Sequence, residues 1–202
     1  MESPIKFFSN WVLNGKDKGM EKNHFASVEN MIKYSTKGID KYKFIDAGCG
    51  NGWAVRKVSS DTKCINAIGV DGSTHMIKKA KMLDDKNEYL CYDLLKWVPK
   101  EKVDIVHSME VFYYFDKPEI LISRIYDNWL KNGGRLIMGI DHYIENIPSH
   151  SWKEDISITT MQLLSKNTWL SFFESAGFSN IEYWYFGKKG KWNGTLIITG
   201  VK

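Results

Sequence analysis

The sequence is poor in cysteine, and its three cysteines lie far apart. Cys49, Cys64 and Cys91 form no C-x-x-C pair, and an odd number cannot pair completely within one chain. A disulfide framework and a zinc centre both need closely spaced cysteines or histidines, so neither is expected. We therefore expect a protein of a reducing compartment.

Long hydrophobic runs are also missing. No apolar stretch approaches the roughly 18 residues that cross a bilayer. The N-terminal residues contain no basic segment followed by an apolar run, which is what a signal peptide would show. These absences predict a cytoplasmic protein with no membrane contact.

An excess of one charge is absent as well. The chain has 28 basic and 24 acidic residues, a net charge of +4, and its lysines are spread along the 202 residues. Nucleic-acid binders usually concentrate basic residues in one patch, so the sequence contains no strong nucleic-acid signal. It also contains nothing that indicates an oligomeric state. The length and the 43% hydrophobic content suit a single domain over residues 1–202.

What the chain does have is an alternation of short apolar runs and amphipathic segments. The predicted strands cover residues 43–47, 65–70, 88–92, 103–108, 135–140, 181–186 and 195–199. The predicted helices cover residues 23–34, 51–58, 73–82, 117–130 and 165–176. Strands that alternate with helices indicate a parallel sheet covered on both faces. In such sheets ligands bind at the carboxyl ends of the strands.

The most informative motif is the run FIDAGCGNG at residues 44–52, which follows a predicted strand and opens a helix. Three alternating glycines allow a tight turn and the close approach of a ligand, and the helix start offers free N–H groups. The dinucleotide fingerprint G-x-G-x-x-G would need a glycine where Trp53 stands. The motif thus favours a nucleoside without phosphates over a nicotinamide cofactor and its oxidoreductase chemistry.

Acidic residues follow the next two predicted strands. Asp71 ends the second strand, where a carboxylate can accept hydrogen bonds from both hydroxyls of a ribose, each worth roughly 1.5–3 kcal/mol. Asp93 follows the third strand and could accept from an exocyclic amine such as that of adenine. The order of these motifs indicates an adenosine-like ligand.

From about residue 43 to the C-terminus, these motifs resemble the class I S-adenosylmethionine-dependent methyltransferases. The resemblance implies a Rossmann-like, doubly wound α/β sheet of seven mainly parallel strands, with the last strand antiparallel, helices on both faces and an N-terminal helical lid. It implies S-adenosyl-L-methionine as cofactor and S-adenosyl-L-homocysteine as product. The cofactor-binding residues that it implies are Asp46, Gly48, Cys49, Gly50, Gly52, Asp71, Gly72, Asp93, Leu94, Ser108 and Met109.

The same resemblance divides the chain. Residues 1–40 would form the lid, residues 43–140 the cofactor-binding core, residues 141–164 a substrate-recognition insertion, and residues 165–202 a closing helix and hairpin. The insertion contains aromatic and acidic residues, which would suit a cationic or amine substrate through cation–π contact. Aromatic residues that pack a small cap would give the same composition, and that simpler interpretation is preferred.

Methyl transfer is an in-line displacement to which the protein mainly contributes positioning. If the acceptor must lose a proton, a base is needed, and the candidates are His142, His24 and Glu110. Glu110, Asp141 and His142 also stand where metal-dependent relatives carry acids, but the flanking turns differ, so no metal is expected. The candidates for acceptor contact are Trp11, Tyr113, Tyr143 and Trp152.

The function expected from these motifs is methyl transfer to the oxygen or nitrogen nucleophile of a small-molecule acceptor. A short lid and one insertion leave little chain to recognise a larger acceptor. Two alternatives stay open: a non-catalytic binding protein of the same fold, and an enzyme that methylates a protein side chain or RNA.

Overall fold

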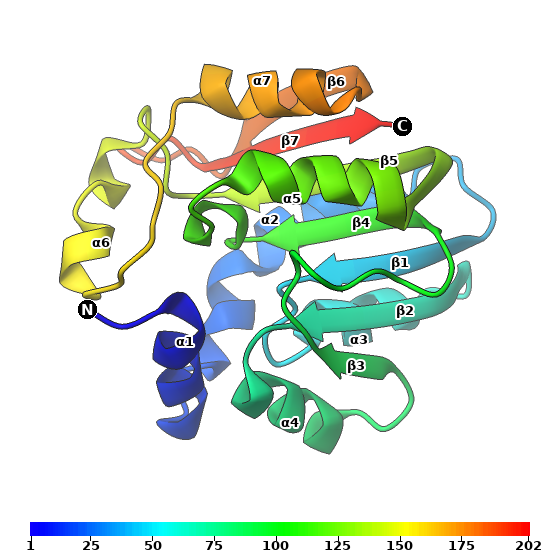
Figure 1. The fold of residues 1–202 in the computed structure, drawn as a ribbon, viewed down its shortest axis with the longest axis horizontal. Coiled ribbons are helices and arrows are strands. Elements are labelled where there is room, and N and C mark those ends of the chain that lie inside the picture. Colours follow the sequence, from blue (N-terminus) through cyan, green and yellow to red (C-terminus); the bar gives the residue numbers. More distant parts are fainter.

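The computed structural model describes residues 1–202 and contains one seven-stranded sheet in the order β3-β2-β1-β4-β5-β7-β6 (Figure 1). Neighbouring strands from β3 to β5 pair in parallel, whereas β7 runs antiparallel to both β5 and β6. The expected doubly wound sheet with an antiparallel last strand is therefore confirmed. The strands are β1 (Tyr42–Ala47), β2 (Cys64–Asp71), β3 (Glu88–Cys91), β4 (Val103–Met109), β5 (Leu130–Ile140), β6 (Ser179–Phe186) and β7 (Thr195–Val201).

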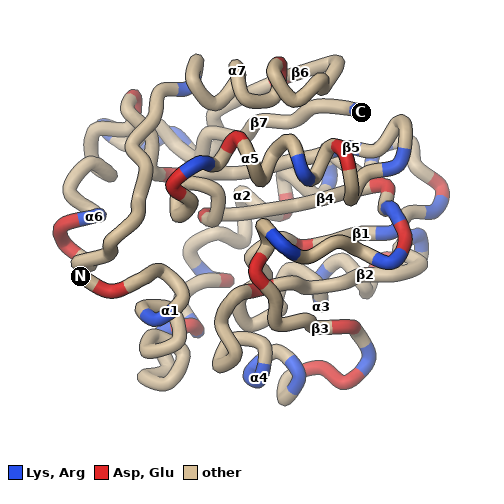
Figure 2. Tube along the Cα trace, viewed as in Figure 1, with Lys and Arg blue, Asp and Glu red and all other residues tan.

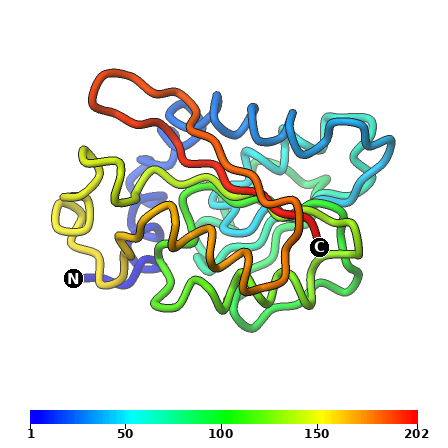
Figure 3. The backbone as a smooth tube through the Cα atoms, turned by 90° about the horizontal axis from the view of Figure 1, so that it is seen from above, coloured from blue at the N-terminus to red at the C-terminus, as the bar shows by residue number.

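Helices form a layer on each side of the sheet (Figure 3). The helices α2, α3 and α4 pack over one face, and α5 and α7 pack over the other. The α-helices are α1 (Pro4–Leu13), α2 (Lys18–Ser35), α3 (Trp53–Ser59), α4 (Thr74–Leu83), α5 (Pro118–Arg124), α6 (Trp152–Asp155) and α7 (Lys166–Ala176). The short turns are the 3-10 helices η1 (Phe112–Tyr114) and η3 (Ile147–Ser149) and the π-helix η2 (Ile125–Trp129).

The core follows from strands that are covered on both faces. Such strands read as continuous apolar runs, and β7 is buried from Thr195 through Gly200. Trp129 and Trp169 are completely buried beside the sheet face that α5 and α7 cover. These two tryptophans are therefore core residues.

The N-terminal segment contains more helical residues than the sequence predicted. Helix α2 begins at Lys18, five residues before the predicted start, and α1 was not separately predicted. Ser3 accepts a hydrogen bond from the backbone N–H of Lys6 at 3.3 Å, and Pro4 occupies the first helical position. Both are ordinary helix-start features, so this signal was present in the sequence.

Two contacts hold α1 over the carboxyl ends of the strands, on the side where α6 also lies (Figure 1). The hydroxyls of Ser9 and Ser73 lie 2.7 Å apart. The backbone of Glu2 exchanges hydrogen bonds of 3.0 and 2.9 Å with Ser157 and Thr159. The N-terminal segment thus touches both the start of α4 and the segment that follows β5.

The helix predicted over residues 117–130 differs from the structure. Helix α5 ends at Arg124, the chain continues through η2, and Leu130 already pairs with Val103 as the first residue of β5. The Trp129 indole N–H donates to the carbonyl of Trp97 at 3.2 Å. Pairing with β4 therefore begins at Leu130, five residues before the predicted start of this strand at residue 135.

Basic and acidic residues alternate along the loops and outer helices (Figure 2). Not one of the helices combines the length and the apolar character needed to cross a membrane.

Gly52, at the start of α3, allows a comparison with Gly133. The two glycines have φ angles of +77° and +78°, but a Cβ on Gly52 would lie 2.4 Å from the Tyr89 ring, whereas a Cβ on Gly133 would meet nothing within 4 Å. Both alanine variants should lose about 1–2 kcal/mol of unfolding free energy from the left-handed backbone. Gly52→Ala should lose about 1–3 kcal/mol more from overpacking. Urea unfolding measures the loss of unfolding free energy in both variants. Equal losses would contradict the close packing of Gly52 against Tyr89.

Candidate functional site

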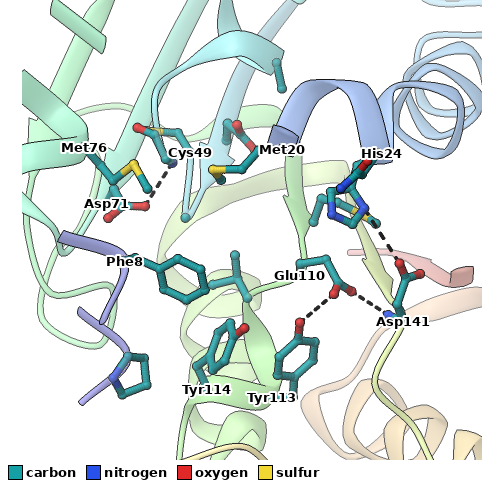
Figure 4. Close-up of a pocket in the computed structure, with 18 of the residues that line it drawn as sticks. Phe8, Met20, His24, Cys49, Asp71, Met76, Glu110, Tyr113, Tyr114 and Asp141 are labelled. Carbon is teal, nitrogen blue, oxygen red and sulfur yellow. Dashed lines mark hydrogen bonds and ion pairs between the residues drawn. The ribbon is translucent and has the colours of Figure 1, made fainter. Parts of the chain in front are cut away.

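A cavity of about 760 Å³ lies at the carboxyl ends of β1, β2, β4 and β5 (Figure 4). Small-molecule sites typically measure about 300–1,000 Å³, so this cavity is large enough for a nucleoside-sized ligand with a small partner. Its walls come from α1, α2, the glycine turn after β1 and the turns after β2, β4 and β5. The topology thus places the cavity where parallel α/β sheets bind ligands.

Two glycines of the turn after β1 lie close to side chains of other elements. Gly48 has a φ of +79°, and a Cβ there would lie 2.3 Å from the Val111 side chain. Gly50 has a φ of +52°, and a Cβ there would lie 2.8 Å from the Met20 side chain of α2. The backbone of this turn therefore passes directly against the turn after β4 and against the lid helix.

The carboxylate of Asp71 connects two turns of the cavity wall. One oxygen accepts the backbone N–H of Gly50 at 2.9 Å, and the other accepts the backbone N–H of Ser73 at 2.7 Å. Burial raises the pKa of Asp71. A carboxylate can accept about four hydrogen bonds, so two positions are left for the two hydroxyls of a ribose.

Most of the residues that were expected to bind the cofactor lie in the wall of this cavity. Asp93 lines it from the turn after β3, and one of its carboxylate oxygens accepts the backbone N–H of Leu95 at 2.9 Å. Together with the glycine turn and Asp71, this arrangement fits an adenosine-type cofactor. The expected cofactor residues that line the cavity are Asp46, Gly48, Cys49, Gly50, Asp71, Gly72, Asp93, Leu94 and Met109.

Gly52 and Ser108 are not part of the cavity wall. Gly52 packs against Tyr89, and the Ser108 hydroxyl donates to the backbone carbonyl of Ala47 at 2.7 Å. Both positions therefore shape the turn and the strand pairing rather than the cavity surface.

Asp46 and His107 form a buried pair on adjacent strands. They are register partners of β1 and β4, and the Asp46 carboxylate lies 2.7 Å from His107 Nδ1. The other ring nitrogen, Nε2, has no hydrogen-bond partner, and both residues line the cavity. Only the strand register brings these two residues together, so the sequence contained no signal for the pair.

Glu110 and Asp141 meet at the ends of β4 and β5 (Figure 4). The Glu110 carboxylate accepts the Tyr113 hydroxyl at 2.6 Å and the backbone N–H of Asp141. His24 of α2 places its Nδ1 3.7 Å from the Asp141 carboxylate. Glu110 has a φ of +60°, a strained value for a residue other than glycine, and such strain costs about 1–3 kcal/mol and concentrates at functional sites.

Enclosure changes the protonation of all three groups. Burial raises the pKa of Glu110 well above its usual value, and the nearby Asp141 carboxylate adds to the rise. Burial also raises the pKa of Asp141, against the opposing effect of His24. Burial lowers the pKa of His24, and Asp141 offsets part of that fall. The cluster therefore carries less charge than three free side chains would.

Two of the candidate residues lie outside the cavity. The ring of His142 points away, with Nδ1 2.9 Å from the carbonyl of Ser149, and the Tyr143 hydroxyl donates to the carbonyl of Gly194 at 2.9 Å. After β5 the chain presents Asp141 to the cavity and turns the next two side chains into the surrounding protein. The remaining candidates for base or acceptor contact, His24, Glu110, Trp11, Tyr113 and Trp152, do line the cavity.

Several cavity residues were not singled out from the sequence. Asp141 was considered only as a metal ligand, and the structure contains no group of three or more His, Cys, Asp or Glu residues that could hold a metal ion. Phe8 lines the cavity from α1, whose apolar spacing was a usable signal. Tyr114 and Trp192 line it from turns that have no regular pattern.

The raised pKa of Glu110 predicts a pH-dependent stability. The folded state holds this proton more tightly than the unfolded chain, so the free energy of unfolding should fall as pH rises above about 4.3, the usual value for a glutamate. Glu110→Gln should remove up to about 1.4 kcal/mol of that fall per pH unit. Urea unfolding over a pH series measures the slope. The exposed Glu174→Gln on α7 is the control, and a Glu110→Gln slope equal to the wild-type slope would contradict the assignment.

Comparison with known proteins identifies part of the chain directly. The family model described as a methyltransferase domain matches residues 45–138. The trans-aconitate 2-methyltransferase of Rhizobium rhizogenes is 27% identical over 111 residues, which are 55% of this chain and 43% of that protein. The chain therefore covers less than half the length of this curated relative.

Solved structures extend the similarity to the whole chain. A chain from the complex between the Haloferax volcanii Trm112 methyltransferase activator and a methyltransferase is 27% identical to this chain. Its TM-score is 0.80, and the match covers 96% of both chains. A SAM-dependent methyltransferase from Thermotoga maritima shares the fold, with 19% identity, a TM-score of 0.74 and coverage of 98% and 99%. The expected resemblance and its cofactor, S-adenosylmethionine, are confirmed: residues 45–138 match a methyltransferase domain, and the whole chain shares the fold of S-adenosylmethionine-dependent methyltransferases.

Proposed function

We propose that the chain transfers a methyl group from S-adenosylmethionine to a small-molecule acceptor with an oxygen or nitrogen nucleophile. The observation that carries this proposal is the continuity of the cavity. It joins the glycine turn and Asp71 to Glu110, Asp141 and His24, and Val111 packs directly on Gly48 between the two groups. A cofactor held at the first group would therefore present its methyl group near the second.

The residues at the cofactor end have separate tasks in this proposal. Asp71 accepts the two ribose hydroxyls, and Asp93 accepts the amine of adenine beside the apolar side chain of Leu94. Met20 of α2 and Ile5 of α1 lie against Gly50 and Gly72, so the lid helices enclose this end of the cavity. Enclosure excludes water and fixes the geometry of the reactants.

The cofactor supplies an activated methyl group on a sulfonium. The chain contributes alignment, which can lower a barrier by roughly 7–11 kcal/mol. Of the candidate bases, His24 and Glu110 line the cavity, whereas His142 does not. The lowered pKa of His24 favours its neutral form, which can accept a proton from an acceptor beside Asp141.

The similarity covers less than half of the trans-aconitate 2-methyltransferase, so the acceptor of that enzyme does not identify the acceptor of this chain. The proposal of a small acceptor rests on the enclosed cavity, which α1, α6 and the segment after α6 help to line. Methylation of a protein side chain or RNA, and cofactor binding without turnover, are the competing functions. The cytoplasmic location stays a prediction.

Cofactor binding tests the proposal first. S-adenosylmethionine and S-adenosylhomocysteine should both raise the midpoint of thermal unfolding, and a ligand at 100 times its Kd adds about 2.7 kcal/mol of stability. Asp71→Asn should weaken S-adenosylhomocysteine binding by about 1.5–3 kcal/mol, because the charged acceptor is lost. Calorimetry at low temperature measures the affinity, with the exposed Asp85→Asn as control.

The outcomes separate the competing functions. No stabilisation by either compound would refute the proposal. Cofactor binding without a methylated product from a metabolite extract, read by mass spectrometry, would support the non-catalytic function. RNA binding with a steep salt dependence would support an RNA acceptor.

A further inference from the structure

We propose that the methyl acceptor is an amine with an apolar or aromatic body, bound as its ammonium ion by Glu110 and Asp141 and flanked by aromatic rings. This inference rests on the proposed function and names the substrate class for the same cavity.

The charge of the cavity wall is the first argument. Five carboxylic acids and two histidines line it, together with Cys49, Tyr113 and Tyr114, and no lysine or arginine is among the lining residues. An anionic acceptor would enter without an opposite charge to pair with, which is costly in an enclosed site. Asp71 and Asp93 are assigned to the cofactor and Asp46 pairs with His107, so a cationic acceptor would meet the other two acids. The acids are Asp46, Asp71, Asp93, Glu110 and Asp141.

The second argument is an acceptor atom without a donor. Asp141 is only 6% exposed, and its Oδ1 has no hydrogen-bond partner. An unsatisfied buried polar atom destabilises the protein by about 1–3 kcal/mol, and Asp141 lines the cavity, so a ligand that donates to this carboxylate would offset that cost. An ammonium group offers three N–H donors, enough for Asp141 and the adjacent Glu110 carboxylate.

The third argument is the aromatic wall beside these acids. The ring centroids of Tyr113 and Tyr114 lie 4.5 Å apart, and that of Phe8 in α1 lies 5.3 Å from the ring centroid of Tyr114 (Figure 4). Trp152 and Trp192 also line the cavity, and their rings stack with centroids 5.9 Å apart. Aromatic faces attract ammonium ions and also bury an apolar body, so one surface would recognise both parts of the acceptor.

Binding of a cation would also change the protonation of the acids. Glu110 lies beside Asp141 after β5 and beside Tyr113 and Tyr114 of η1, and His24 of α2 lies against Asp141. Two carboxylates this close disfavour a second negative charge, and their pKa values are raised. An ammonium ion would offset that repulsion, so amine binding should release a proton from the cluster.

The transfer step balances with the groups present. The bound ammonium ion first loses one proton to the Asp141–His24 pair, which passes it to solvent. The nitrogen lone pair then forms a bond to the methyl carbon while the carbon–sulfur bond breaks, and that electron pair stays on sulfur. The products are a methylated ammonium ion, S-adenosylhomocysteine and one proton.

Three probes of similar shape test the charge preference. Protein saturated with S-adenosylhomocysteine is titrated by calorimetry with 2-phenylethylamine, 2-phenylethanol and phenylacetate. The amine should bind at least about tenfold more tightly than the alcohol, a difference of about 1.4 kcal/mol, and the anion most weakly. The amine enthalpy should vary with the ionisation enthalpy of the buffer, because a proton is released. Phenylacetate binding as tight as the amine, or no amine binding up to about 10 mM, would overturn the inference.

Variants assign the preference to the two acids. Glu110→Gln and Asp141→Asn should each weaken amine binding about tenfold or more and leave the alcohol and S-adenosylhomocysteine unchanged. Their exposed controls, Glu174→Gln and Asp85→Asn, should match the wild type. Equal losses for amine and alcohol, or a matching loss of S-adenosylhomocysteine affinity, would overturn the role of the acids. Failure of the wild type to bind S-adenosylhomocysteine would instead refute the proposed function.

Discussion

The cofactor end of this protein depends on the carboxylate of Asp71. It accepts the backbone N–H of Gly50 on one oxygen and that of Ser73 on the other, so it joins the turn after β1 to the turn after β2. With these turns fixed, Gly48 lies against Val111 and Gly50 against Met20. A single side chain thus joins the turn after β2 to the glycine turn, whose backbone lies against the turn after β4 and against α2.

The rest of the cavity comes from segments that are distant in the sequence. Glu110 and Asp141 follow adjacent strands, and His24 reaches them from α2. Their enclosure raises the pKa values of both acids and lowers that of the histidine. The acids and the aromatic rings around them give the acceptor end a chemical character different from that of the cofactor end, where backbone turns dominate.

The tryptophans show how far residue patterns can predict position. Trp129 and Trp169 fall within predicted helices, and both are core residues. Trp11 and Trp152 were expected near the acceptor, and both line the cavity. Trp192 was assigned to the closing hairpin, yet it also lines the cavity beside Trp152, because the loop between β6 and β7 extends past the end of the sheet (Figure 3).

The sequence by itself determined the alternation of strands and helices, the glycine turn, the acid that ends β2 and the acid that follows β3, because periodicity and turn chemistry act over a few residues. Only the tertiary structure decided that His107 pairs with Asp46, that Asp141 faces the cavity and that His142 does not. Those outcomes depend on strand register and on the direction of the chain after β5, where a change of one residue points a side chain to the opposite side. Such long-range placement leaves no local pattern to detect.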